Sequence, residues 1–258
     1  MVILMQNENE HTYDNGWRPK EVKLKPNYKF YNRNIFFIFF SQVILFISRV
    51  WVFFARLLMG VRIKGRKNKH KVKGAIIICN HTHPLDSFFL VTCFHFRKVY
   101  VTMLESNLGF GWKSGYIRLA AAVPIPTERR QIRRFGEQTE KTLKKGRNVL
   151  FFAEAALMPY CDHIRNFLPG AFHYAVSFDR PILPCCITFH KPKGIYKLFH
   201  KKKPVMRLNF LDPYYIKQQE SRKDTIQTAT QEVHSIIDNY FRQNSDYFYE
   251  NGEKIKKA

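Results

Sequence analysis

Short apolar runs rich in β-branched and aromatic residues alternate with amphipathic segments over most of this 258-residue chain. The run Ala75–Cys79 reads AIIIC, which is typical of a strand buried on both faces. Further strands are expected at Val99–Met103, Val123–Ile125, Val149–Phe152, Ile182–Thr188 and Val205–Phe210. Because helical patterns separate most of these runs, we expect an α/β fold with a mixed, mostly parallel sheet flanked by helices.

The segments between the expected strands carry start and stop signals of helices. A helix expected at Asp86–His95 follows Pro84, and Thr127 is expected to cap another helix that Gly146 ends. The remaining helices are expected at Trp112–Ala121, at Ala171–Phe178 and around Ile226, Val233, Ile237 and Tyr240, whose spacing is helical. No internal repeat interrupts this pattern, which favours one domain.

An uncharged stretch between Arg33 and Arg49 reads NIFFIFFSQVILFIS. As a helix it spans about 22 Å, against about 30 Å for the hydrocarbon core of a bilayer, so it is short for a crossing. Polar residues recur through Arg56 and leave a narrow polar stripe on an apolar helix. We expect this helix to lie in a membrane interface, with its Phe-rich side in lipid and its Arg side toward the headgroups. The alternative is an amphipathic helix packed on the protein's own core.

The charge balance points to an anionic partner. Lys and Arg number 43 against 20 Asp and Glu, a net charge of +23. Two blocks, Arg62–Lys73 and Lys191–Lys203, contain no acidic residue. Such a field attracts nucleic acid or an anionic membrane surface. The sequence has no nucleic-acid-binding motif and its aromatic residues lie in apolar runs, so we expect an anionic membrane surface and no nucleic acid. For the second block, a solvated basic face remains the alternative.

The cysteines and histidines do not suggest a disulfide scaffold or a metal site. The chain has five cysteines and no C-x-x-C motif, which argues against a secreted disulfide framework. His81 and His83 form an H-x-H pair near Cys79, but no further ligands follow at metal-binding spacing. No metal is therefore expected.

These patterns divide the chain into four segments. Residues 1–33 form an N-terminal extension, and residues 34–61 the membrane-associated helical segment. Residues 62–245 form the α/β domain, and residues 246–258 a terminal tail.

The loop after the first strand holds the best candidates for catalysis. In sheets of this type, chemistry takes place at the loops that leave the carboxyl ends of the strands. His81 follows the strand, and Asp86 opens the next helix. A carboxylate that holds one imidazole nitrogen leaves the other free to accept a proton, so the pair is a candidate general base for a hydroxyl nucleophile. Alternatively, Asp86 only caps the helix and His81 only fills the turn.

A second such loop contains Glu154, directly after the strand Val149–Phe152. Its position at the edge where substrates bind makes it a candidate binding residue. The alternative is an ordinary surface carboxylate.

Together these residues resemble the glycerolipid acyltransferases typified by the lysophosphatidic acid acyltransferases. His81-x-x-x-x-Asp86, introduced by Asn80, is similar to the H-x-x-x-x-D box of that family. The block from Lys145 to Glu154 resembles the F-P-E-G-T-R block with its lead-in, and Pro181–Pro184 resembles the V-P-I-x-P strand.

The resemblance implies transfer of a fatty acyl group from an acyl-CoA or acyl-carrier-protein thioester to a hydroxyl of a lysophospholipid, such as 1-acylglycerol-3-phosphate, in phospholipid biosynthesis. It implies His81 as the base, Asp86 as the group that orients it, and Glu154 as a residue that helps to bind the acceptor. It implies no cofactor beyond the acyl donor. It also implies peripheral or monotopic attachment, which we expect at the cytoplasmic face of the cell membrane.

Two boxes depart from the family pattern. Ala155-Ala156-Leu157 stands where the family has Gly-Thr-Arg, so the cation for the acceptor's phosphate is missing. In the second box the family's arginine falls near Thr127, with Arg129 and Arg130 just beyond. Arg129, Arg130, His163 and Arg165 could replace the missing cation, and Thr127, Arg129, Arg130 and Arg165 are candidate acceptor-binding residues. These departures keep two alternatives open: a phosphate-free acceptor, or a membrane-associated scaffold without activity.

Overall fold

The computed structural model describes residues 22–94, 98–199, 203–250 and 253–256. Most of the expected N-terminal extension and part of the second basic block therefore lie outside the described residues.

The described part of the chain is built on a seven-stranded sheet in the order β1-β7-β6-β2-β5-β3-β4. The strands are β1 (Arg62–Lys64), β2 (Ile76–Cys79), β3 (Val99–Leu104), β4 (Ala122–Ile125), β5 (Asn148–Phe152), β6 (Ile182–His190) and β7 (Val205–Phe210). β6, β2, β5, β3 and β4 run parallel to one another, whereas β7 is antiparallel to β6. β1 pairs with β7 and runs parallel to it. The expected mixed, mostly parallel sheet is confirmed.

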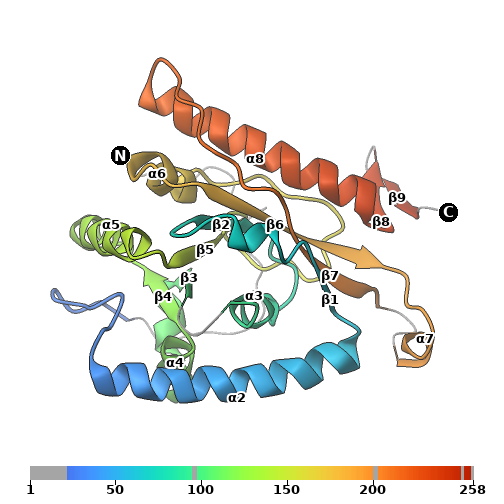
Figure 1. The fold of residues 1–258 in the computed structure, drawn as a ribbon, viewed down its shortest axis with the longest axis horizontal. Coiled ribbons are helices and arrows are strands. Elements are labelled where there is room, and N and C mark those ends of the chain that lie inside the picture. The colour runs from blue at the N-terminus through green and yellow to red at the C-terminus, as the bar shows by residue number, and fades with distance from the viewer. Residues whose placement is uncertain (1–21, 95–97, 200–202, 251–252, 257–258) are drawn as a thin grey trace.

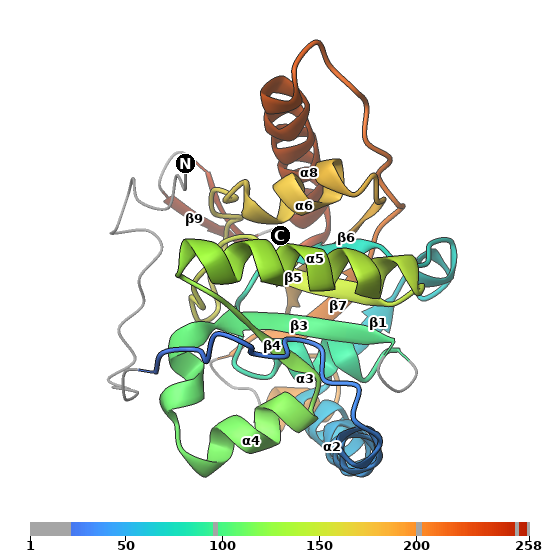
Figure 2. The same ribbon diagram turned by 90° about the vertical axis from the view of Figure 1, so that its left-hand side faces the viewer.

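Helices cover both faces of this sheet (Figures 1 and 2). One face carries α5 (Arg129–Lys144), α6 (Gly170–Ser177) and α8 (Arg222–Asn244). The opposite face carries α3 (Asp86–Val91) and α4 (Trp112–Leu119), and α2 (Ile35–Met59) lies outside these two helices. Within the described residues, 3-10 helices are formed by Asn68–His70 and Glu105–Gly109.

The long helix α2 binds the domain through its polar stripe. Its buried residues are Ser41, Leu45, Ser48 and Val52, and this spacing keeps them on one face. The Ser41 hydroxyl donates to the carbonyl of Leu119 at 2.5 Å, and Ser48 lies 3.1 Å from the Tyr116 hydroxyl. The prediction that this stripe faces lipid headgroups was therefore wrong, because α4 supplies the polar partners. The Phe-rich face of α2 points away from the domain and is exposed.

Part of the N-terminal extension packs on the core. Leu24, Phe30 and Tyr31 are buried. The Phe30 ring lies 5.4 Å from the ring of Phe135 on α5, and the Tyr31 hydroxyl lies 2.9 Å from that of Thr139. The described residues of the extension therefore belong to the folded unit.

The start of α5 differs from the expectation. Thr127 does not cap this helix, because its backbone N–H and its hydroxyl donate to the Glu105 carboxylate at 2.9 and 3.0 Å. Glu128 occupies the N-cap position in extended conformation. The helix ends as expected, with Gly146 at a φ of 71°.

Short elements in charged segments were not expected from the sequence. They are β1 within the first basic block, α7 (Tyr196–Phe199) within the second, and a hairpin of β8 (Tyr247–Glu250) and β9 (Glu253–Lys256) in the terminal tail. In addition, the helix that was expected to run from Asp86 to His95 ends at Val91.

We expect Gly65→Ala to lower the free energy of unfolding by at least about 2 kcal/mol. Gly65 follows β1 at a φ of 67°, and an added Cβ would lie 2.0 Å from the carbonyl oxygen of Phe210. Gly115→Ala is the matched control, since it adds its Cβ to α4 with nothing within 4 Å. Urea unfolding of both variants measures the difference; equal stabilities would contradict this role of Gly65.

Candidate active site

The pairing of β2 with β5 brings the two candidate loops together. The strands are parallel neighbours, and Cys79 lies opposite Phe152 at their carboxyl ends. His81 comes two residues after Cys79, and Glu154 comes two residues after Phe152. The two loops therefore leave the sheet side by side, at the carboxyl edge where the candidate chemistry was expected.

The expected histidine–carboxylate pair is present. Nδ1 of His81 lies 3.2 Å from Oδ2 of Asp86. The Asp86 side chain is fully buried, whereas the His81 side chain keeps 19% of its surface exposed. The same Oδ2 accepts the backbone N–H groups of Thr82 and His83, both at 2.7 Å. These two N–H donors hold Oδ2 in place beside the imidazole, where it can accept a hydrogen bond from Nδ1 of His81. Nε2 is then left as the basic nitrogen.

An aromatic ring sets the plane of the imidazole. The His81 ring stacks on Phe152, with 3.9 Å between ring centroids and 16° between planes. The stack and the bond to Asp86 together restrict the rotation of the His81 side chain. Phe152 was not predicted as a site residue from the sequence; its only sequence signal is its place at the end of the strand before Glu154.

Asn80 ties this loop to the neighbouring strand β6. Its fully buried amide donates to the carbonyl of Ile187 at 3.1 Å and accepts the Ile187 N–H at 2.8 Å. The asparagine next to the histidine is thus an anchor on the side of β2 that β5 does not occupy.

Glu154 is not a surface carboxylate; it is fully buried. Its Oε2 accepts the backbone N–H of His81 at 3.2 Å and the guanidinium of Arg165 at 2.8 Å. Its Oε1 accepts the backbone N–H of Arg165 at 3.2 Å. Burial raises the pKa of the Glu154 carboxyl, and these donors act in the opposite direction.

The residues proposed to bind the acceptor lie in different places. Arg165 is 5% exposed, and its guanidinium also donates to the carbonyl of Ala156. Thr127, Arg129 and Arg130 are exposed and follow β4, three strands from β2 in the sheet order, or about 14 Å away. His163 lies beside Cys161 and Asp162, with 3.4 Å from its Nδ1 to Oδ1 of Asp162. Only Arg165 contacts the groups that hold His81.

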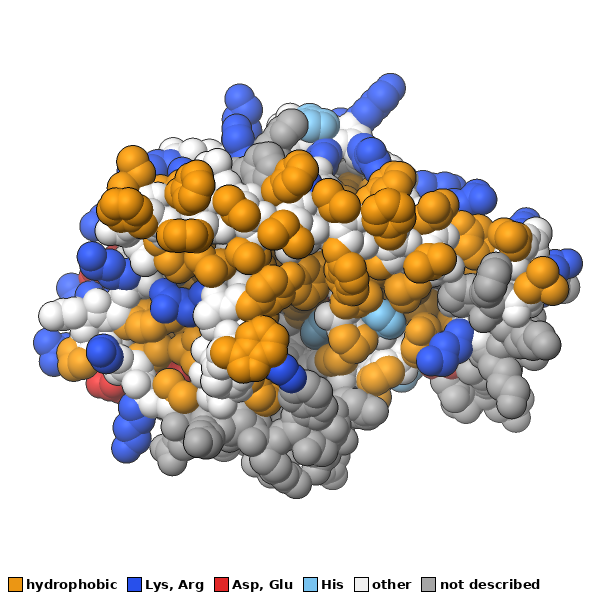
Figure 3. Space-filling model, turned by 90° about the horizontal axis from the view of Figure 1, so that it is seen from below, with side chains coloured by type: hydrophobic (Ala, Val, Ile, Leu, Met, Phe, Trp, Pro, Cys, Tyr) orange, Lys and Arg blue, Asp and Glu red, His pale blue; other side chains and the backbone are white. Residues whose placement is uncertain are grey.

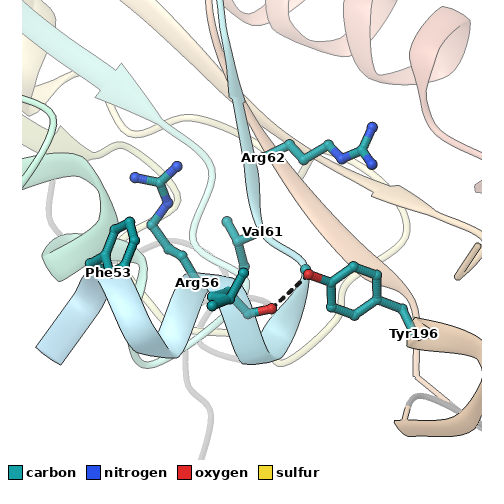
Figure 4. A pocket seen from close by; sticks show the side chains of 7 residues that line it. Phe53, Arg56, Val61, Arg62 and Tyr196 are labelled. Carbon is teal, nitrogen blue, oxygen red and sulfur yellow. Dashed lines mark hydrogen bonds between the residues drawn. The ribbon is translucent and has the colours of Figure 1, made fainter. Parts of the chain in front are cut away.

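A cavity of about 180 Å³ lies elsewhere, at the carboxyl end of α2 (Figure 4). Its lining consists of Phe53, Arg56, Leu57, Gly60, Val61, Arg62 and Tyr196. The Tyr196 hydroxyl donates to the carbonyl of Leu57 at 2.7 Å and so holds α7 against this end of α2. None of the lining residues belongs to the His81 or Glu154 loops, so this cavity is separate from the candidate active site.

The arrangement suits base catalysis on a hydroxyl. A hydroxyl that approaches Nε2 of His81 can give up its proton while its oxygen attacks an electrophile. The imidazolium that forms is stabilised by the buried carboxylate of Asp86, which the N–H groups of Thr82 and His83 keep in place.

Comparisons with known proteins relate the chain to acyltransferases. A family model described as Acyltransferase matches residues 60–188. An uncharacterised acyltransferase of Schizosaccharomyces pombe is 26% identical over 211 residues, which span 76% of this chain and 68% of that protein. The 1-acyl-sn-glycerol-3-phosphate acyltransferase of Pseudomonas aeruginosa is 29% identical over 150 residues, which span 54% of this chain and 56% of that protein.

A solved structure shares the fold. The crystal structure of the 1-acyl-sn-glycerophosphate acyltransferase PlsC from Thermotoga maritima superposes with a TM-score of 0.51 at 19% sequence identity. The match covers 81% of this chain and 90% of that chain.

We expect Arg165→Met to lower the free energy of unfolding by about 3–5 kcal/mol, because it leaves the Glu154 carboxylate buried without its cation. Combining it with Glu154→Gln should recover part of the loss. The control is Arg133→Met, which breaks an exposed ion pair with Glu137 and should cost less than about 1 kcal/mol. A urea-unfolding double-mutant cycle measures these effects, and additive losses from the two changes would show that the pair is not coupled.

Proposed function

The chain belongs to the acyltransferase family, and we propose that it transfers a fatty acyl group from a thioester to the hydroxyl of a lysophospholipid. The family match confirms the resemblance drawn from the His81, Glu154 and Pro181–Pro184 motifs. The proposed acceptor is 1-acylglycerol-3-phosphate, by likeness to the Pseudomonas aeruginosa relative, and the proposed donor is acyl-CoA or acyl-carrier protein. The single observation that carries the proposal is the His81–Asp86 pair at 3.2 Å.

The proposed reaction needs one base and no covalent intermediate on the protein. Nε2 of His81 takes the proton of the acceptor hydroxyl while the hydroxyl oxygen attacks the thioester carbonyl. A new C–O bond forms, and the carbonyl electrons move to oxygen. Collapse of this tetrahedral intermediate breaks the C–S bond, and the departing thiolate takes the proton back from His81. The products are the ester and the free thiol, and the base is regenerated.

Glu154 contributes to this reaction by holding the loop that carries His81. The resemblance assigns it to acceptor binding, but its carboxylate is buried and holds the His81 N–H and Arg165. We therefore propose that Glu154 positions the His81 loop, and that any effect on the acceptor follows from that. Acceptor binding by Thr127, Arg129 and Arg130 stays a prediction.

One observation supports a second candidate acceptor, a hydroxyl compound without phosphate. Leu157 stands at the place of the family's phosphate-binding arginine, and this departure makes a hydroxyl acceptor without phosphate the alternative. The intact His81–Asp86 geometry, by contrast, argues against an inactive scaffold.

We also propose that the enzyme docks on the cytoplasmic face of the cell membrane through α2. Among the described helices, α2 alone has the length and apolar composition to cross a membrane. Its polar stripe packs along the domain, however, which favours a helix that lies flat. Its exposed large apolar residues are Ile35, Phe36, Phe39, Phe40, Val43, Phe46, Ile47, Val50, Trp51, Phe53, Phe54, Leu57 and Leu58.

Figure 3 shows this apolar band along α2, with histidine side chains in a hollow beside it. Trp112, at the start of α4, adds an aromatic ring that is 81% exposed. Docking through this band would therefore place the candidate site at the level where amphiphilic donors and acceptors meet.

We expect His81→Ala to lower kcat/KM for acyl transfer by about 10²–10⁴-fold, because it removes the general base. Asp86→Asn should also lower kcat/KM, since it weakens the partner of Nδ1. His70→Ala, an exposed histidine on a 3-10 helix, is the matched control and should behave as wild type. Thiol release from acyl-CoA with 1-acylglycerol-3-phosphate, together with mass spectrometry of the lipid product, measures the effect. Unchanged turnover by His81→Ala would exclude the base assignment.

We expect the wild-type protein to float with anionic phospholipid vesicles and to keep part of that binding at 1 M NaCl, where surface electrostatics are screened. Replacing Phe39, Phe46 and Phe53 together by Asp should abolish the salt-resistant part, because each buried Phe contributes about 1.5–3 kcal/mol. Ile236→Asp, on α8 at the far side of the sheet, is the control. Flotation of the triple variant at wild-type level would rule out docking through α2.

A further inference from the structure

Lys203, from the second basic block, lies beside the candidate active site. It comes two residues before β7, which is antiparallel to β6. β6 runs parallel to β2, so the amino end of β7 lies at the same sheet edge as the loop that follows Cys79. Topology thus brings Lys203 and His81 to one edge although 122 positions separate them in the sequence.

Tyr160 connects this lysine with the histidine loop. Nζ of Lys203 lies 5.6 Å from the centre of the Tyr160 ring. That ring lies 5.8 Å from the ring of His83, and the Tyr160 backbone N–H donates to the carbonyl of Thr82 at 2.9 Å. A cation over an aromatic face is held near the ring without losing its positive charge.

The positive charge of Lys203 affects the pKa of His83 in the loop that carries His81. Burial lowers the pKa of His83, the Asp86 carboxylate opposes that change, and Lys203 lowers the pKa further. Lys203 is exposed and forms no ion pair with an acidic residue of the described chain. Its ammonium is therefore available to an anion that enters the site.

The other candidate cations are less suited to an acceptor's phosphate. The guanidinium of Arg165 is buried and bound to Glu154 and to the carbonyl of Ala156. Arg129 and Arg130 follow β4, three strands from β2. Lys203 is an exposed cation over Tyr160, and Tyr160 contacts the loop that carries His81.

We propose that Lys203 binds the phosphate of the glycerolipid acceptor and so replaces the arginine missing after Glu154. This inference rests on the proposed function, and it assigns the acceptor class as a phosphomonoester. Three donors on a flexible stem suit a terminal phosphate, which lies a few bonds from the hydroxyl that His81 deprotonates.

Steady-state kinetics of Lys203→Ala test the proposal. We expect KM for 1-acylglycerol-3-phosphate to rise about tenfold with little change in kcat, which is the pattern of a lost binding contact. Turnover of a monoacylglycerol, which has no phosphate, should stay unchanged. Lys203→Arg should keep KM within about threefold of wild type, because it retains the positive charge.

Lys193→Ala is the matched control, since it removes an exposed lysine from the same basic block. An equal rise in KM for Lys193→Ala would overturn the proposal, because the effect would then come from total charge. A rise in KM for acyl-CoA instead of the acceptor would also overturn it and would assign Lys203 to the donor's phosphates.

Calorimetric binding of 1-acylglycerol-3-phosphate separates this inference from the proposed function. A tenfold weaker Kd in Lys203→Ala, with no acyl transfer by wild type on any glycerolipid, would leave the phosphate site standing and refute the acyl transfer. Acyl transfer by wild type with equal Kd and KM in Lys203→Ala would refute the phosphate site alone.

Discussion

The parallel pairing of β2 with β5 is the constraint on which the candidate site depends. Because Cys79 lies opposite Phe152, the residues two positions further, His81 and Glu154, leave the sheet together. The Glu154 carboxylate can then accept the His81 N–H, and the Phe152 ring can lie against the imidazole. On the other side, Asn80 binds both backbone groups of Ile187 in β6. A one-residue shift in the β2–β5 register would turn these side chains to opposite faces and dismantle the site.

Two buried carboxylates, Asp86 and Glu154, hold different parts of this site. Asp86 is held by backbone N–H donors and faces the imidazole, so its charge acts on the proposed base. Glu154 is held by Arg165 and faces the backbone of the loop, so its charge acts on the loop's shape. Buried ion pairs of this kind add little net stability, since desolvation offsets their attraction, but they penalise every arrangement in which a partner is missing. In the proposed reaction, groups held in this way need no reorganisation when charge develops.

The helix α2 joins the domain to its proposed membrane surface by using both of its faces. Hydroxyl groups on the polar stripe bind the carbonyl of Leu119 and the Tyr116 hydroxyl of α4, while the apolar face stays exposed. A soluble domain seldom exposes so continuous an apolar band, which is why we propose that it contacts lipid. The same packing directs the band and the hollow beside it to one side of the molecule.

Local patterns in the sequence were enough to determine the strands from Ala75 to Phe210, the helices between them, and the His81-x-x-x-x-Asp86 box, because periodicity and close spacing are properties of neighbouring residues. They did not reveal β1 or α7, whose short charged segments carry no apolar period. They also left open which side of α2 meets the domain, whether Glu154 is buried, and which cation lies near His81. Those features depend on contacts such as Ser48 with Tyr116 and Lys203 with Tyr160, between residues more than 40 positions apart. Only the packing of the sheet and its helices brings such residues together, so only the tertiary structure could decide them.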